Sequence, residues 1–370
     1  MRFLCFLFLL ASGGALAQDF YLLVGTYDSP KSEGIYVYRF SSRSGTAAPV
    51  SHSKISNPSF LALSPARPYV YAVLENAKEG NGGEVAAFEF NKTSGELTFL
   101  NRQFTGGDHP CYVETDKTGK WVFAGNYSSG SLAVLPVENN GGLSPAASVI
   151  QHRGSGLNPQ RQQSPHVHCT LMAPDNQWLL VPDLGIDKLM IYRFDASTGK
   201  LTTGRQPFAA SEPGAGPRHF TFHPSQKYGY LVEELSGTVV AYKYRKGRLK
   251  PFQRISTLPA GDSSFAGSAD IHISADGKFL YASNRSVSNT LAIYSIHKKG
   301  KLSLVGHQST LGKGPRNFSI DPTGKFLLVG NQQSDEIVIF ERNEQTGLLK
   351  DTGNRIPLGK PVCLKWIPAN

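Results

Sequence analysis

The chain has 370 residues, of which 40% are hydrophobic and 18% are charged, with 38 Gly and 23 Pro. This balance supports a folded globular protein and excludes intrinsic disorder and a collagen-like repeat. A single compact core stops growing at roughly 250 to 300 residues, so this length predicts two domains, a barrel with insertions or a repeat array.

The first 17 residues have the pattern of a targeting segment. A basic start is followed by an unbroken apolar run over residues 3–10 and by small residues that end in Ala15-Leu16-Ala17. This pattern predicts a cleavable secretory signal, cut after Ala17, and a mature protein that begins at Gln18 and is periplasmic or secreted. No later apolar run reaches the 18 or so residues that a bilayer requires, so we expect no membrane span.

The formal net charge is +10, and loss of Arg2 with the signal leaves +9. A basic balance can indicate nucleic acid, an anionic surface or an anionic small substrate. The basic residues form only short groups, such as Lys298-Lys299, among Gly-rich turns. We therefore interpret most of the charge as solvated surface and expect no nucleic-acid partner.

Cysteine usage also limits the fold. Cys5 leaves with the signal, and Cys111, Cys169 and Cys363 remain. Three cysteines cannot all pair within one chain, so the fold cannot depend on a dense disulfide framework.

An internal repeat decides the architecture. A Pro or Ser anchor, an alternating stretch, a Gly-Lys turn, an apolar run and a second alternating stretch recur in the same order along the chain. The anchors are Pro58, Pro110, Pro165, Pro217, Ser268, Pro315 and Pro361. They lie 52, 55, 52, 51, 47 and 46 residues apart. About four strands for each period of roughly 50 residues is typical of a β-propeller blade.

The two ends of the chain complete the count. Residues 361–367 supply only the first strand of a blade, whereas residues 20–25 and 35–40 resemble the second and third strands. Together they make one composite blade, which closes the ring and leaves no large exposed sheet edge. We therefore predict an all-β, seven-bladed β-propeller, with residues 18–370 forming a single domain.

The repeat also predicts where functional groups gather. In a propeller the first strand of each blade lines the central channel. The start of each inner strand carries Ser59, Cys111, His168, Arg218, Ala269, Arg316 and, in the closing blade, Val362. Small or apolar residues satisfy packing there, so His168, Arg218 and Arg316 are candidates for function.

Antiparallel pairing places the end of each second strand beside the start of the first. Glu233, Glu234 and Arg285 occupy such ends and should reach the same face as His168. The longest connection between blades, residues 150–164, reaches this face too and brings Arg161 with it, as a lid or rim loop.

A His or Glu, a carboxylate and several arginines at one mouth fit hydrolysis or isomerisation of an anionic ester-like substrate. Arginine binds carboxylate, phosphate or a developing oxyanion, and a His, or a Glu whose pKa is raised by burial, can activate water. Each of these residues also has a purely structural interpretation. His168 could pack in the channel, the arginines could bond to carbonyls of neighbouring blades, and Glu233-Glu234 could be solvated surface residues. His166 and His168 alternate on the predicted strand, but two histidines without a third ligand are weak evidence for a metal, and we expect none.

Three segments carry a resemblance to a known family. They are Ser164-Pro165-His166-Val167-His168, Gly216-Pro217-Arg218-His219 and the stretch from Ser274 to Arg285. In combination they resemble the seven-bladed lactonase propellers, which include bacterial 6-phosphogluconolactonase and the fungal carboxymuconate lactonising enzymes. The resemblance covers essentially the whole chain after the signal.

The resemblance implies a metal-independent lactonase without a cofactor, acting on a small anionic sugar lactone. Its motifs place the catalytic groups at His168, Arg218, Glu234 and Arg285. Further substrate contacts are expected from His166, Arg161, Glu233 and Arg316. A muconate-type lactonising enzyme and a non-catalytic binding propeller remain as alternatives. The exact lactone, the identity of the base and the oligomeric state, monomer or dimer, stay open.

Overall fold

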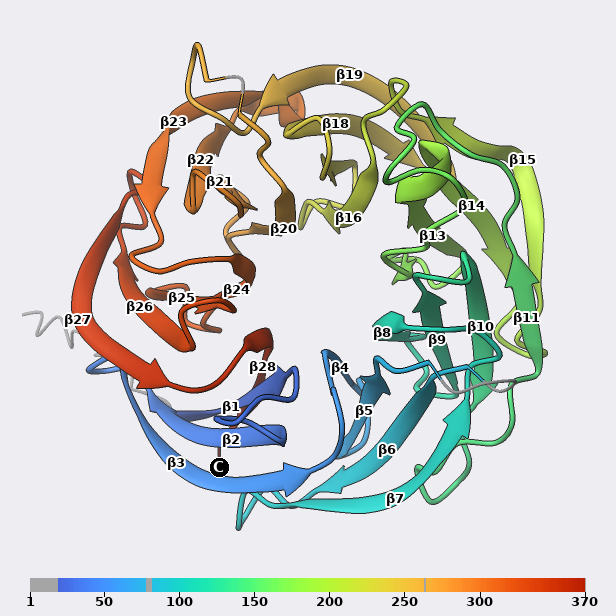
Figure 1. Ribbon diagram of the computed structural model, residues 1–370, viewed down its shortest axis with the longest axis horizontal. Helices are drawn as coiled ribbons and strands as arrows, with labels where there is room; N and C mark the ends of the chain where they lie inside the picture. The colour runs from blue at the N-terminus through green and yellow to red at the C-terminus, as the bar shows by residue number, and fades with distance from the viewer. Residues whose placement is uncertain (1–18, 78–81, 263, 370) are drawn as a thin grey trace, which may run out of the picture.

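The computed structural model describes residues 19–77, 82–262 and 264–369 of the chain. These residues form seven four-stranded antiparallel sheets and no α-helix. The sheets stand around a central axis like the blades of a propeller (Figure 1). The predicted seven-bladed β-propeller is therefore confirmed, whereas the predicted signal, residues 1–17, lies outside the described residues.

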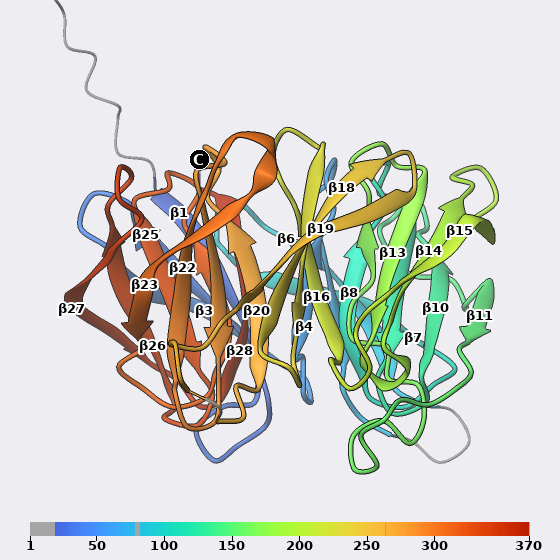
Figure 2. The same cartoon turned by 90° about the horizontal axis from the view of Figure 1, so that it is seen from above.

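Each blade runs from an inner strand at the channel to an outer strand at the rim, and the strands connect the two faces of the ring (Figure 2). The inner strands are β28 (Pro361–Pro368), β4 (Phe60–Leu63), β8 (Pro110–Thr115), β12 (Leu171–Met172), β16 (Pro217–Phe222), β20 (Ser268–Ile273) and β24 (Pro315–Ile320). The second strands are β1 (Asp19–Thr26), β5 (Tyr69–Leu74), β9 (Trp121–Asn126), β13 (Trp178–Asp183), β17 (Tyr228–Glu233), β21 (Phe279–Asn284) and β25 (Phe326–Asn331).

The third strands are β2 (Gly34–Ser41), β6 (Glu84–Phe90), β10 (Ser131–Pro136), β14 (Lys188–Phe194), β18 (Thr238–Arg245), β22 (Thr290–Ile296) and β26 (Glu336–Arg342). The outer strands are β3 (Thr46–Lys54), β7 (Leu97–Phe104), β11 (Ser148–Gln151), β15 (Leu201–Ala210), β19 (Arg248–Ser256), β23 (Leu302–Ser309) and β27 (Leu349–Pro357). Two short 3-10 turns, Leu184–Ile186 and Lys298–Gly300, complete the elements.

The Asp-x-Thr-Gly-Lys turn, which occurs at residues 116–120 and 321–325, links an inner strand to a second strand by a side-chain cap. In the turn after β8, the buried Asp116 carboxylate accepts hydrogen bonds from the backbone N–H groups of Thr118, Lys120 and Trp121 at 2.8–3.0 Å. Gly119 has a φ of +68°, a conformation that favours glycine. The repeat is thus visible in the sequence because its turn geometry requires these residue types.

The blades adhere through apolar side chains that pack between neighbouring sheets. Phe123 of β9 packs edge-to-face on Phe194 of β14 in the next blade, with ring centroids 5.1 Å apart. Similar clusters of buried Val, Leu, Ile and aromatic residues lie between the other blades. This packing fixes how each inner strand faces the channel.

The composite blade forms as predicted from both ends of the chain. The strand β28 pairs with β1, with Val24 opposite Leu364 and Leu22 opposite Trp366. In Figure 1 the red β28 lies directly inside the blue β1. The ring is thereby closed by hydrogen bonds between segments more than 300 residues apart in the chain.

One local prediction is wrong. Residues 166–168 do not form a regular strand: Val167 makes a single bridge to Asp183, and β12 contains only Leu171 and Met172. Pro182 accepts a hydrogen bond from the His168 N–H at 3.1 Å, but it has no N–H to return. The ladder is therefore interrupted beside His168.

If the closing strand contributes to stability as the other blades do, Leu364→Ala should destabilise the protein by about 2–5 kcal/mol, because it leaves a cavity in a packed core. Leu364 and Leu328 are both buried in the same cluster, so Leu328→Ala is the matched control. Denaturant unfolding of both variants measures the effect. A loss below about 1 kcal/mol for Leu364→Ala alone would contradict the closure of the ring by this strand.

Candidate active site

The residues that start the inner strands meet at one end of the channel. Six of the seven aligned positions line one small hollow: Ser59, Cys111, His168, Arg218, Arg316 and Val362. The seventh, Ala269, accepts a hydrogen bond through its carbonyl from the Arg218 guanidinium. The residues that start the seven inner strands, which the repeat aligns in sequence, therefore form a ring around the channel.

A larger cavity of about 230 Å³ adjoins this hollow and shares Cys111, His168 and Arg316 with it. It is lined by Tyr27, Glu75, Cys111, Tyr127, Arg161, His168, Glu234, Arg285 and Arg316. Five of these nine residues were candidates from the sequence. Tyr27, Glu75, Cys111 and Tyr127 were not, although each lies at a strand end or inner-strand start that the blade alignment identifies.

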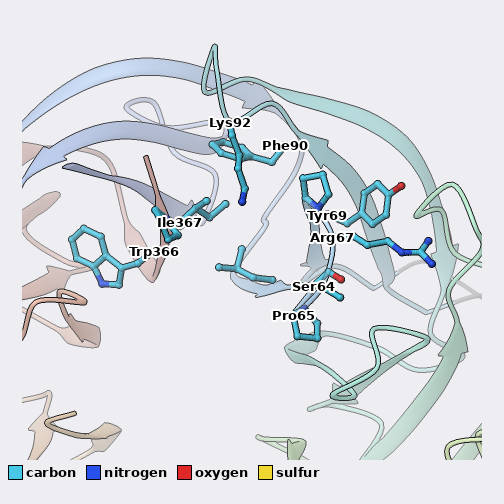
Figure 3. Close-up of a pocket in the computed structure, with 12 residues that line it drawn as sticks. Ser64, Pro65, Arg67, Tyr69, Phe90, Lys92, Trp366 and Ile367 are labelled. Carbon is cyan, nitrogen blue, oxygen red and sulfur yellow. The ribbon is translucent and has the colours of Figure 1, made fainter. Parts of the chain in front are cut away.

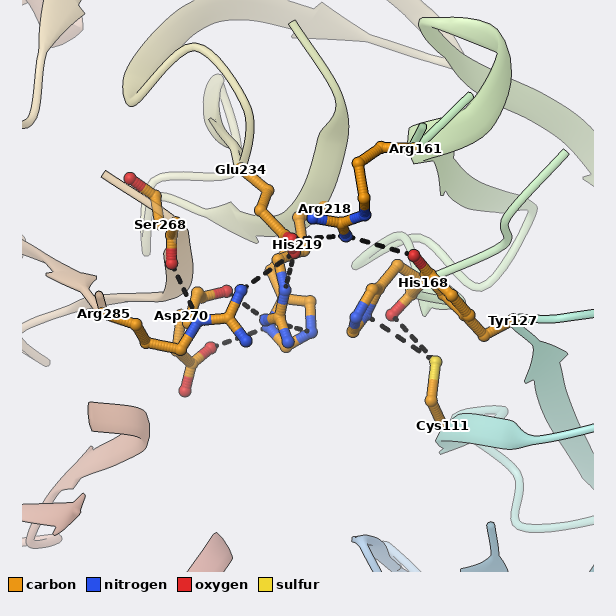
Figure 4. Close-up of polar contacts among 12 residues, drawn as sticks. Cys111, Tyr127, Arg161, His168, Arg218, His219, Glu234, Ser268, Asp270 and Arg285 are labelled. Atoms are coloured by element: carbon orange, nitrogen blue, oxygen red, sulfur yellow. Dashed lines mark hydrogen bonds and ion pairs between the residues drawn. The ribbon is translucent and has the colours of Figure 1, made fainter. Parts of the chain in front are cut away.

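Glu234 is the centre of the polar cluster (Figure 4). It follows β17, and its side chain is 4% exposed. One carboxylate oxygen accepts from Arg161 at 2.7 Å, and the other accepts from Arg218 at 2.9 Å and faces Arg285 at 3.1 Å. A single carboxylate thus binds three guanidinium groups from different parts of the ring.

The three guanidinium groups set the charge state of Glu234. Burial alone raises the pKa of this carboxyl, but Arg285, Arg218 and Arg161 outweigh burial and lower the pKa to about 2. The interpretation of Glu234 as a base whose pKa is raised by burial is therefore wrong, because the pKa is lowered. At neutral pH Glu234 is therefore a carboxylate that orients the three arginines.

The arginines differ in their access to the cavity. The Arg218 side chain is 1% exposed, and its donors are directed to Glu234, Ala269 and His219. Arg285 donates to the Gly267 carbonyl at 2.8 Å and keeps a side chain that is 19% exposed. Arg285 can therefore reach a ligand directly, whereas Arg218 acts through Glu234.

Arg316 differs from the other three arginines in its contacts. Its guanidinium stacks over the Tyr27 ring, 5.3 Å from the centroid, and among the described residues it makes no ion pair within 4.0 Å and no hydrogen bond. A guanidinium with free donors in a cavity is a strong binding group for an anion or a polarised carbonyl.

His168 lies at the floor of the cavity. Its Nδ1 is 3.7 Å from the Cys111 Sγ, and its ring meets Tyr127 and His219 edge-on. Burial, together with Arg218, His219 and Arg316, holds the pKa of His168 well below its usual range. The imidazole is therefore neutral at physiological pH.

His166 and Glu233 lie outside the cavity lining. His166 stacks on Tyr127 at 4.5 Å and pairs through Nδ1 with the Tyr127 carbonyl at 2.9 Å, so it supports the rim. Glu233 is the last residue of β17 and alternates in direction with Glu234. Its carboxylate accepts from Arg254 of the outer strand β19 at 2.6 Å, which removes it from the cluster.

The predicted rim loop reaches the site and is anchored rather than free. The His152 ring pairs with the Asp183 carboxylate at 2.6 Å and with the Tyr192 hydroxyl at 2.9 Å, and all three residues are buried. The buried Gln162 donates to the Leu184 carbonyl at 2.8 Å and to Asp187 at 2.7 Å. Between these anchors the loop extends Arg161 over the cavity.

A second hollow, of about 280 Å³, lies at the opposite ends of β4 and β28 (Figure 3). Its lining includes Arg67, Lys92 and Trp366 but none of the candidate site residues.

The cysteines do not provide a nucleophile. Cys111, Cys169 and Cys363 are buried free thiols, and burial raises the pKa of Cys169 to about 12. Within the described ranges no group of three or more His, Cys, Asp or Glu side chains is placed to hold a metal ion.

The profile of the family described as Lactonase, 7-bladed beta-propeller, matches residues 21–366. The chain belongs to this lactonase family. It is 40% identical over 334 residues to a 6-phosphogluconolactonase of Formosa agariphila, covering 89% of this chain and 94% of that protein. It is 37% identical over 349 residues to a 6-phosphogluconolactonase of Bacillus subtilis, covering 93% and 97%.

Solved structures agree with the family assignment. The periplasmic gluconolactonase of Pseudomonas aeruginosa superposes on this lactonase-family propeller with a TM-score of 0.91 at 37% identity, covering 95% of this chain and all of that one. A protein of Lactobacillus plantarum superposes with a TM-score of 0.87 at 33% identity, covering 94% and 99%.

The charge of Glu234 should be visible in the pH dependence of stability. Because the folded pKa of about 2 lies below the ordinary 4.5, the carboxylate stabilises the fold above pH 4.5, and this contribution disappears as the pH falls towards 2. Glu234→Gln should therefore lower the free energy of unfolding at pH 7 by about 3 kcal/mol. Denaturant titrations at pH 7 and pH 3 should show a smaller difference from wild type at pH 3, and a difference independent of pH would contradict this charge assignment.

Proposed function

We propose that this lactonase-family propeller hydrolyses a sugar-derived lactone, and that the substrate is phosphorylated, as 6-phosphogluconolactone is, giving 6-phosphogluconate. The main support is the position of Arg316. Its guanidinium lines the same cavity as the arginine-bound Glu234 and has free hydrogen-bond donors. The names of the Formosa and Bacillus relatives support the same substrate class.

The charge around the cavity favours an anion. Four guanidinium groups, those of Arg161, Arg218, Arg285 and Arg316, face two carboxylates, Glu75 and Glu234. The excess of two positive charges matches a phosphate or a carboxylate at neutral pH. The cavity of about 230 Å³ suits one small sugar derivative rather than a polymer.

Lactone hydrolysis places negative charge on the carbonyl oxygen as water adds to the carbonyl carbon. Donors that are already oriented stabilise that charge without reorganising during the reaction. In our proposal Arg316 and Arg285 bind the carbonyl oxygen, because both line the cavity. Arg161, whose side chain is 36% exposed at the mouth, then faces the phosphate.

The remaining candidates position these groups. Arg218 is too deeply buried to touch substrate, so it orients Glu234, which in turn orients Arg161 and Arg285. His168 and Tyr127 shape the floor and wall, and His166 fixes Tyr127. The names of the relatives from Formosa and Bacillus, both 6-phosphogluconolactonases, favour an enzyme over a binding propeller.

Purified protein should accelerate acid release from 6-phosphogluconolactone over the spontaneous rate, and EDTA should not change the rate. Arg316→Met should lower kcat/KM by about 10²–10³-fold, the usual effect of removing an oxyanion donor. Arg205→Met, on the exposed face of the outer strand β15, is the matched control and should retain wild-type activity. Equal activity of the two variants would remove Arg316 from the site.

We also propose that the protein is exported and works outside the cytoplasm. The leader pattern of residues 1–17 and the periplasmic location in the name of the Pseudomonas relative support this. No helix within the described residues is long and apolar enough to cross a membrane. Expressed in a Gram-negative host, the full chain should be recovered from the periplasm or medium with Gln18 as its first residue; recovery of uncleaved protein from the cytoplasm would contradict export.

A further inference from the structure

Hydrolysis needs a group that accepts a proton from water, and the two obvious candidates are poor acceptors. Glu234 already accepts from two guanidiniums and faces a third, and protonation would break these contacts. His168 is surrounded by Arg218, His219 and Arg316, so a proton on its imidazole would add positive charge to a cationic site. Both groups are thus better suited to holding the site than to moving protons.

Glu75 is the other carboxylate in the cavity lining. It follows β5, and its N–H donates to the Asn57 carbonyl at 3.0 Å, which fixes the backbone. Its Oε2 accepts a hydrogen bond from the Tyr27 hydroxyl at 2.7 Å. Among the described residues its Oε1 accepts no hydrogen bond and Glu75 makes no ion pair, so one oxygen is free to bind water.

Tyr27 links this carboxylate to Arg316. Burial raises the pKa of the Tyr27 phenol above its ordinary value, so the hydroxyl stays protonated and donates to Glu75. The face of the same ring packs against the Arg316 guanidinium. A proton acceptor and an anion-binding group are therefore oriented by one side chain.

We propose that Glu75 is the general base of the lactone hydrolysis and that Tyr27 is its positioning residue; this inference rests on the proposed function. Glu75 Oε1 takes a proton from water as the water oxygen bonds to the carbonyl carbon. The bond between that carbon and the ring oxygen then breaks, and Glu75 returns the proton to the ring oxygen, which leaves as a hydroxyl. The carboxylic acid formed loses its own proton to solvent.

The test compares Glu75→Gln with Glu89→Gln in the hydrolysis of 6-phosphogluconolactone. Glu89 lies on the exposed face of β6 in the same blade and is the matched control. Glu75→Gln should lower kcat by about 10²–10⁴-fold with little change in KM, and Glu89→Gln should match wild type. Glu75→Ala should regain activity in sodium formate, because a small carboxylate can occupy the space left and take the proton, and a purely structural role predicts no such rescue.

Tyr27→Phe removes only one hydroxyl and keeps the ring under Arg316, so it tests the same idea in a fold that is barely changed. It should lower kcat by about 3- to 10-fold, the effect of one hydrogen bond, and leave KM for the lactone near the wild-type value. Activity within 3-fold of wild type for Glu75→Gln, confirmed as folded by circular dichroism, would overturn the role of Glu75. A wild-type protein without lactonase activity would instead overturn the proposed function itself.

Discussion

The charge balance around Glu234 is the interaction on which the site depends. Burying guanidinium groups at the mouth of a channel is unfavourable unless a carboxylate is close to them. Glu234 supplies that carboxylate to Arg218 of its own blade, to Arg285 of the next blade and to Arg161 of the rim loop. Removing it would leave several largely buried cations close to each other without a counter-charge.

The fold explains how these groups come together. Each blade starts its inner strand at the same level, so one position of the repeat becomes a ring around the channel. Second strands end beside these starts, which brings Glu75, Glu234 and Arg285 to the same level. Closure by β28 and β1 completes the circle and keeps the blades in register.

The site has two parts with different properties. On one side, Glu234 is saturated with arginines and fixes their geometry. On the other, Arg316, Tyr27 and Glu75 keep free hydrogen-bonding capacity towards the cavity. A rigid cationic frame beside a guanidinium and a carboxylate that keep free hydrogen-bonding capacity suits the binding and hydrolysis of an anionic lactone.

The sequence predicted the blade count, the composite blade and the level at which the candidate site residues lie, because turn residues and strand alternation repeat with a clear period. It also predicted that Arg161, Arg218, Glu234 and Arg285 converge. It did not reveal which arginines are saturated, since that depends on side-chain direction across blades.

Other features of the site could not be predicted from the sequence because they also depend on contacts between distant residues. Glu75 and Tyr27 stand at strand ends that the alignment marks, but nothing in their local sequence distinguishes them from solvated residues. The pairing of Glu233 with Arg254 on the outer strand depends on alternation at a single residue. The interruption of the ladder beside His168 follows from Pro182, whose effect depends on which residue it faces.

The most direct test of the account is a crystal structure of the protein with 6-phosphogluconate, the product of the proposed reaction. We predict that the product occupies the cavity, with its carboxylate on Arg316 and Arg285 and its phosphate towards Arg161. A product bound outside this cavity, or a cavity left empty at saturating concentration, would contradict the assignment of the arginine-lined mouth as the active site.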